Sequence, residues 1–224
     1  GRRRHSNPHS HRIEPIRRLT ASDSQKGPLI VSATARITAF LETAATRFDS
    51  HDSDIAREIS RALQSLQPIA PALAPATLGA CAPLPEMLAR AKDDMAQRLA
   101  TCLGDLHWRF AGFGKLPPGT EQKLAVVELI GPSGMFPHAH LRAGLLIQRE
   151  GFHYPRHRHA AEELYFILSG TAEWAVDDHP HAPRLPGEFV HHASLQPHGM
   201  ITRDEPMLAM WGWIGDIDGA SYST

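Results

Sequence analysis

A group of residues in the second half of the chain has the spacing of a metal site. In the frame G-x5-H-x-H-x3-E-x6-G they are Gly151, His157, His159, Glu163 and Gly170. Alternate positions of a strand face the same side, so His157 and His159 would direct two imidazoles toward one ion. After a turn at residues 160–162, Glu163 would return a carboxylate, and His198 supplies a third imidazole from a Gln-Pro-His sequence. The spacing therefore predicts a metal bound by His157, His159, Glu163 and His198.

These four ligands would bind one divalent ion and leave one or two of its coordination positions open. Imidazoles and a carboxylate without a thiolate suit Fe²⁺, Zn²⁺, Mn²⁺, Ni²⁺ or Co²⁺ and do not select among them. A substrate carboxylate or carbonyl held at an open position would have a more acidic neighbouring C–H, so that a base could remove the proton. His191 or His192, an adjacent pair, is an alternative ligand.

Two of the three tyrosines stand beside the predicted ligands and are candidate catalytic bases. Tyr165 lies two positions after the carboxylate ligand, so its phenol should face the metal, and a nearby cation favours phenolate. Tyr154 has the opposite phase to the first histidine ligand, unless Pro155 breaks the strand and redirects it. Tyr222 is interpreted as part of a tail.

Aromatic residues on the predicted strands are candidates for the wall of a substrate cavity. They are Phe166, Trp174, Trp211 and Trp213. The alternative is that they only fill the core. If two of them line the cavity, the ring faces would favour a cationic substrate by about 1–2 kcal/mol.

The elements that must position these residues change type along the chain. Residues 1–27 are rich in Arg, His, Pro and Ser and are expected to form a flexible basic tail. Residues 28–122 show apolar residues at helical spacing and predict a helical N-terminal extension. Its helices carry the apolar stripes 29–48 and 55–66, with Ser53 or Asp54 as a cap, and a third helix is expected at about 86–103 after a Pro/Ala-rich link. These helices should brace a barrel or form a homodimer contact.

From residue 123 the apolar spacing approaches two, which is typical of strands. The predicted strands are 124–130, 144–148, 164–168, 172–176 and 208–213. Many short strands between Gly and Pro residues favour a mainly β fold, a cupin or double-stranded β-helix (jelly-roll) barrel, over residues 123–224. In a closed barrel His198 can reach the other ligands from a strand distant in sequence.

Composition limits the other functions. The net charge of −1 gives no general electrostatic case for a nucleic acid or membrane partner. Cys81 and Cys102 lie far apart and outside any C-x2-C frame, so we expect two buried thiols in a reducing compartment. Without a run of 18 apolar residues or the order of a secretion signal, the sequence predicts a cytoplasmic protein, which we take to be bacterial.

The string from His153 to Trp174, HYPRHRHAAEELYFILSGTAEW, resembles the cupin-type dimethylsulfoniopropionate (DMSP) lyases. The resemblance spans about residues 144–213. It implies a carbon–sulfur lyase of the dimethylpropiothetin dethiomethylase type, which converts a zwitterionic small molecule to dimethyl sulfide and acrylate by β-elimination. It also implies a divalent metal at the four predicted ligands and a tyrosine as general base, with Tyr154 favoured and Tyr165 beside the metal.

Three other functions use the same ligands. An Fe(II)-dependent cupin dioxygenase would consume O₂ during turnover. A cupin isomerase would act on a neutral polyol or keto acid and would not need an aromatic wall. A non-catalytic small-ligand binding protein would leave its ligand unaltered.

Overall fold

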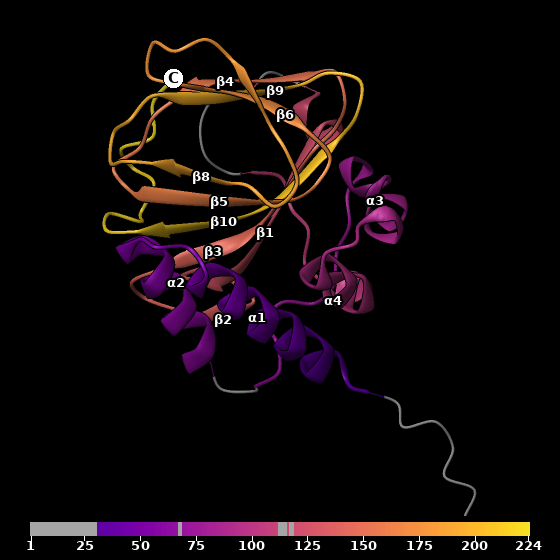
Figure 1. Ribbon diagram of the computed structural model, residues 1–224. Helices are drawn as coiled ribbons and strands as arrows, with labels where there is room; N and C mark the ends of the chain where they lie inside the picture. Colours follow the sequence, from indigo (N-terminus) through magenta and orange to yellow (C-terminus); the bar gives the residue numbers. More distant parts are fainter. Residues whose placement is uncertain (1–30, 67–68, 112–115, 117–118) are drawn as a thin grey trace, which may run out of the picture. The chain divides into compact units, whose positions relative to one another are not determined.

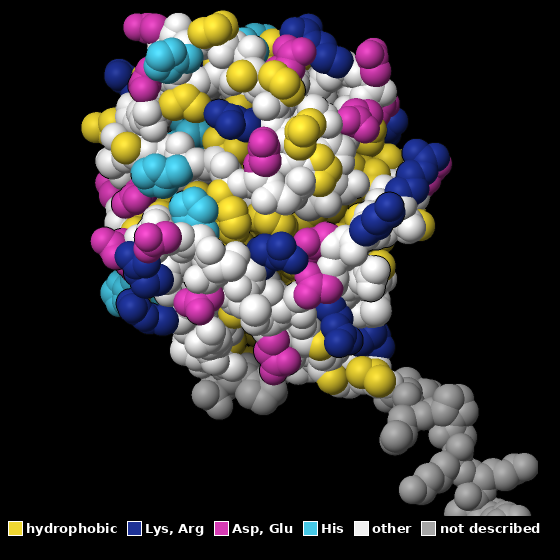
Figure 2. All heavy atoms as spheres, viewed as in Figure 1, with side chains coloured by type: hydrophobic (Ala, Val, Ile, Leu, Met, Phe, Trp, Pro, Cys, Tyr) yellow, Lys and Arg dark blue, Asp and Glu magenta, His cyan; other side chains and the backbone are white. Residues whose placement is uncertain are grey.

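The computed structural model describes residues 31–66, 69–111, 116 and 119–224 (Figure 1). Residues 31–224 form one compact unit, and the predicted tail at 1–27 lies outside the described residues. Within the described ranges, no helix is both long and apolar enough to cross a membrane. Acidic and basic side chains are interspersed over the face shown in Figure 2.

Helices occupy the first part of the described chain, as the sequence predicts. They are α1 (Ala33–Asp49), α2 (Asp54–Ser65), α3 (Leu84–Arg90) and α4 (Asp94–Cys102). Ser53 caps α2, its side chain accepting a hydrogen bond from the Ala56 amide at 3.3 Å, which confirms the predicted cap. The single helix predicted at 86–103 is wrong, because α3 ends at Arg90 and Asp93 starts α4 by accepting from the Met95 amide at 2.9 Å.

Strands then form two sheets that face each other across the barrel (Figure 1). The six-stranded sheet has the order β2-β1-β3-β10-β5-β8, and the four-stranded sheet has the order β4-β9-β6-β7. The bounds are β1 (Leu124–Gly131), β2 (Phe136–Pro137), β3 (Arg142–Gln148), β4 (Phe152–His157), β5 (Glu162–Ser169), β6 (Ala172–Val176), β7 (Ala182–Arg184), β8 (Phe189–His192), β9 (His198–Thr202) and β10 (Met207–Ile214). The five predicted strands are confirmed as β1, β3, β5, β6 and β10. Two facing, largely antiparallel sheets make this a cupin jelly-roll barrel with an N-terminal helical extension.

The six-stranded sheet is buried on both faces, which gives the molecule two apolar cores. One face packs against the helices, and the other lines the barrel interior. On β10, Gly212 faces the helices and leaves room for Ile59 of α2, while Trp211 and Trp213 on either side of it face inward. The helices therefore brace the outer face of the barrel.

The same alternation corrects one predicted substrate-binding residue. Phe166 lies one position after Tyr165 on β5, so it faces the helices. There its ring packs on Phe189, with centroids 4.9 Å apart, and under the guanidinium of Arg47. Phe166 therefore supports the sheet from outside and does not line the barrel interior.

Candidate metal centre

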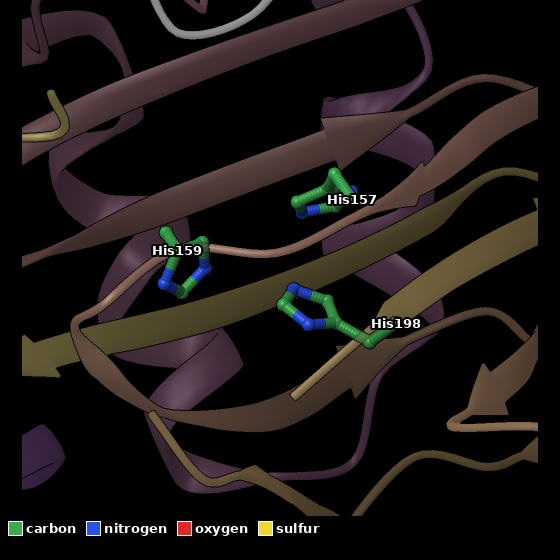
Figure 3. Close-up of side chains that lie close together, drawn as sticks. All are labelled: His157, His159 and His198. Carbon is green, nitrogen blue, oxygen red and sulfur yellow. The ribbon is translucent and has the colours of Figure 1, made fainter. Parts of the chain in front are cut away.

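The four predicted ligands come from both sheets and lie inside the barrel. Two overlapping groups of side chains there could hold a metal ion, one of His157, His159 and His198 and the other of Glu163, His192 and His198. His157 ends β4, His198 begins β9, and the two residues are direct partners in the four-stranded sheet. His159 follows in the loop after β4, and Glu163 projects from β5 of the opposite sheet. All four side chains are buried. Figure 3 shows the imidazoles of His157, His159 and His198 gathered around a common space.

A β-bulge at Pro155 sets the direction of Tyr154. Tyr154 pairs with Met200 and His157 pairs with His198, so β4 contains one residue more than β9 between these pairs. Proline has no amide hydrogen and can leave the ladder without losing a bond. The extra residue brings Tyr154 and His157 to the same face, with ring centroids 4.6 Å apart. The predicted redirection at Pro155 is confirmed.

Backbone carbonyls hold each histidine with Nε2 directed at the common space. The Nδ1 atom lies 2.8 Å from the Pro155 oxygen in His157 and 3.0 Å from the Ala161 oxygen in His159. In His198 it lies 2.9 Å from the Gln196 oxygen. A carbonyl only accepts, so Nδ1 carries the hydrogen and Nε2 keeps a lone pair.

Two of these Nε2 atoms, those of His159 and His198, are buried without a hydrogen-bond partner among the residues that the structure describes. Such atoms cost free energy unless something else satisfies them, and a metal ion does so. Glu163 Oε2 lies 3.3 Å from His159 Nε2 and 3.2 Å from His198 Nε2. Ligands bound at about 2.1 Å to one ion, at right or tetrahedral angles, lie about 3.0–3.4 Å apart. The donor set therefore fits a divalent ion.

The charge states of His157 and Glu163 agree with this fit. Burial lowers the pKa of His157 to about 3, so its imidazole is neutral and keeps a lone pair. Burial opposes ionisation of Glu163, but the neighbouring imidazoles, first that of His159, outweigh it and hold the pKa of Glu163 well below its ordinary value. A neutral imidazole and an ionised carboxylate are the forms that bind metal. In His159, burial opposes protonation, but the Glu163 carboxylate outweighs it and raises the pKa of the imidazole, so metal binding there would release a proton.

The two alternative ligands have other partners. His191 is exposed and its Nε2 contacts Glu162 at 2.8 Å. His192 is buried, but its Nε2 accepts a hydrogen bond from the Trp174 indole at 3.1 Å, which leaves Nδ1 to donate to Glu163 Oε2 at 3.2 Å. With both nitrogens engaged, His192 orients the carboxylate of Glu163 in this structure, and it could bind an ion only by giving up one of these hydrogen bonds.

Trp213 holds the other oxygen of the same carboxylate. Its indole Nε1 donates to Glu163 Oε1 at 2.6 Å, and its ring lies against His159 with centroids 4.3 Å apart. Because one oxygen of Glu163 is held by Trp213, the second is left facing the histidines. From the sequence, Trp213 was predicted to line a substrate cavity, and no local pattern indicated its hydrogen bond to Glu163.

A cavity lined largely by aromatic side chains reaches the ligand cluster. It is bounded by Tyr154, Tyr165, Tyr222, Trp211 and Trp213 and touches His157 and Glu163. Trp174 is outside this lining and packs edge-on behind Tyr165, with centroids 5.2 Å apart. Of the four aromatic residues proposed as a cavity wall, Trp211 and Trp213 are in it.

The interpretation of Tyr222 as tail is wrong. Its hydroxyl donates a hydrogen bond to the Tyr154 hydroxyl at 3.1 Å, and its ring stacks on His157 with centroids 4.9 Å apart. No apolar periodicity surrounds Tyr222, so a pattern search for helices and strands cannot find it. Its aromatic type, in a protein with three tyrosines, was the only available signal.

Replacing Trp213 with Phe should weaken metal binding by about 10–100-fold, because the aromatic ring stays while the hydrogen bond to Glu163 is lost. Titration of the metal-free protein with Zn²⁺ or Co²⁺ measures this. Trp211→Phe is the matched control, since the Trp211 indole nitrogen is buried with no hydrogen-bond partner in the described part of the chain and its loss should leave metal affinity unchanged. Equal affinities for both variants would contradict the role of Trp213.

Comparison with known proteins gives a consistent result. The profile of the dimethylsulfoniopropionate lyase family matches residues 50–209. The DMSP lyase DddQ of Ruegeria pomeroyi is 38% identical over 118 residues, which are 52% of this chain and 59% of that protein. The chain thus aligns with less than two thirds of the length of this curated relative.

Solved structures agree with the fold. A chain from the crystal structures of the DMSP lyases RdDddP and RnDddQII has a TM-score of 0.67 at 24% identity, covering 86% of this chain and 99% of that one. The crystal structure of DddQ from Ruegeria pomeroyi has a TM-score of 0.59 at 26% identity, covering 83% and 95%. The family match spans most of the barrel and part of the helical extension, so this chain belongs to the dimethylsulfoniopropionate lyase family.

Proposed function

We propose that this protein is a metal-dependent carbon–sulfur lyase that cleaves DMSP to dimethyl sulfide and acrylate. The observation that carries the proposal is one cavity in which a metal-ligand cluster, an aromatic wall and tyrosine hydroxyls meet. Membership of the DMSP lyase family, and the name of the relative DddQ, supply the substrate.

One divalent ion, Fe²⁺, Zn²⁺, Mn²⁺, Ni²⁺ or Co²⁺, would be held by His157, His159, Glu163 and His198. When bound there, it would attract the substrate carboxylate, make the adjacent C–H more acidic and offset the burial that keeps the nearby phenols protonated. Trp213 and His192 hold the Glu163 carboxylate in place for it.

The aromatic wall suits the other end of the zwitterion. Trp211 and Trp213 lie edge to face with centroids 5.7 Å apart and offer indole rings to the cavity. A sulfonium cation against such rings gains about 1–2 kcal/mol when water is removed. With its carboxylate at the ligand cluster and its sulfonium at the indoles, the substrate would place its α-carbon between them, within reach of the phenols.

The proposed elimination needs one base and no other reactant. A phenolate oxygen takes the proton from the carbon α to the carboxylate, and the electron pair of that C–H bond becomes the second bond between the α and β carbons. The C–S bond breaks, and its electron pair leaves on sulfur as dimethyl sulfide. Acrylate remains, and the proton passes from the tyrosine to water before the next turnover.

We assign the base role to Tyr154 and a place beside the metal to Tyr165. Burial raises the pKa of Tyr154 to about 12, whereas the hydrogen bond donated by the Tyr222 hydroxyl acts in the opposite direction. Burial raises the pKa of Tyr165 well above its ordinary value, and the Tyr165 ring lies against Trp174 and His192. A hydroxyl that already accepts a hydrogen bond is the easier one to ionise.

The test is gas-phase detection of dimethyl sulfide after DMSP is added to protein loaded with each of the five metals, with acrylate measured by NMR. We expect equal amounts of both products and none from metal-free protein. Uptake of O₂ with DMSP loss would favour a dioxygenase instead. Unaltered DMSP after long incubation with every metal would favour a binding protein.

A further inference from the structure

A segment near the end of the chain folds back over the loop that carries the metal ligands. We call residues 217–223 the strap. Its Ser223 pairs with Arg158 through two backbone hydrogen bonds of 2.9 and 3.0 Å. The Ser221 hydroxyl accepts a hydrogen bond from the Ala160 amide at 2.8 Å. At its start, the Ile217 carbonyl accepts a hydrogen bond from the buried Arg142 side chain at 2.7 Å.

The pairing register determines where Tyr222 points. Because Arg158 and Ser223 form an antiparallel bridge, the next opposed pair is His159 and Tyr222, whose side chains share one face. That face is the one that carries His157 and His159. The Tyr222 ring accordingly stacks over His157 at 4.9 Å and 17° and over His159 at 6.2 Å and 23°.

The hydroxyl of Tyr222 ends at the hydroxyl of Tyr154, 3.1 Å away, with Tyr222 as donor. The Tyr154 ring also contacts His157, at 4.6 Å between centroids. Tyr154 is therefore held at its ring by a metal-ligand residue and at its oxygen by the strap. The hydrogen bond fixes where the oxygen lies, and the ring contact limits rotation of the phenol about its own axis.

We infer that Tyr222 is a positioning residue with two separable actions. Its hydroxyl holds the oxygen of Tyr154 in the direction from which it takes the substrate proton, an action that rests on the proposed function. Its ring covers the imidazoles of His157 and His159 and keeps them oriented for metal binding, an action that does not depend on which reaction follows.

Two variants separate these actions. Tyr222→Phe keeps the ring, so metal affinity and melting temperature should match the wild type, while kcat falls about tenfold and KM changes less than twofold. Tyr222→Ala loses the ring as well and should weaken Zn²⁺ or Co²⁺ binding by about 10–100-fold. Thr224→Ala, an exposed position beside the strap, is the matched control and should behave as the wild type.

The kinetic and metal-binding results test the two actions of Tyr222 separately. If the wild type releases dimethyl sulfide and Tyr222→Phe has the same kcat, the hydroxyl action is wrong. A parallel loss of melting temperature and metal affinity in Tyr222→Phe would replace positioning by a purely structural role. Metal affinity of Tyr222→Ala equal to that of the wild type would refute the ring action. If the wild type releases no dimethyl sulfide, the proposed function fails and the hydroxyl action with it, and the metal titrations still decide the ring action.

Discussion

Tyr154→Phe is expected to lower the rate of dimethyl sulfide release by about 10²–10⁴-fold, the usual contribution of a general base. The ring of Phe can keep the contact with His157, so one metal ion per chain should still bind. The loss should appear in kcat, because the phenol oxygen acts on the reacting C–H and not on the ends of the substrate that hold it in the cavity.

Tyr165→Phe is the comparison that assigns the base. Tyr165 lines the same cavity, and we expect its loss to cost less activity than the loss of Tyr154. Metal content and melting temperature are measured for both variants, so that a damaged site is not taken for a missing base. Retained dimethyl sulfide release by Tyr154→Phe, together with its loss in Tyr165→Phe, would move the base role to Tyr165.

His159→Ala should lose both bound metal and elimination. Removal of this imidazole leaves three of the four proposed ligands and takes away the ring that lies against Trp213. We expect less than about 1% of wild-type dimethyl sulfide release under the same metal concentration, because the open cluster no longer holds the ion. Elemental analysis of the purified variant, after dialysis with Zn²⁺ or Fe²⁺, measures the metal directly.

His153→Ala is the matched control for this loss. His153 belongs to the same strand as His157, but it is exposed and faces His181 at 6.1 Å between ring centroids. Metal content and activity of this variant should equal those of the wild type. A His159→Ala protein that keeps one metal per chain and full activity would mean that the ion is held elsewhere.

Local patterns in the sequence were sufficient to predict the fold and the spacing of the candidate metal ligands. The alternation of apolar residues in β5 and β10 and the helical stripes of α1 and α2 arise from backbone periods that each segment carries within itself. The spacing of His157, His159 and Glu163 is short enough to be recognised in the same way. Alternation also places Phe166 and its neighbour Tyr165 on opposite faces of β5, so the prediction of Phe166 in the cavity wall conflicts with a local pattern.

The partners of those ligands depend on residues that are distant along the chain, and no local pattern encodes them. Trp213 meets Glu163 across 50 positions and Tyr222 meets Tyr154 across 68 positions. The first contact depends on the register of the strands and the second on the path of the strap. A shift of one residue in either pairing would turn the side chains to the opposite face. From its sequence alone the protein is a cupin with a predicted metal site. Which side chains hold the carboxylate and the phenol in place was decided only by the closure of the barrel, because that closure sets which distant faces meet.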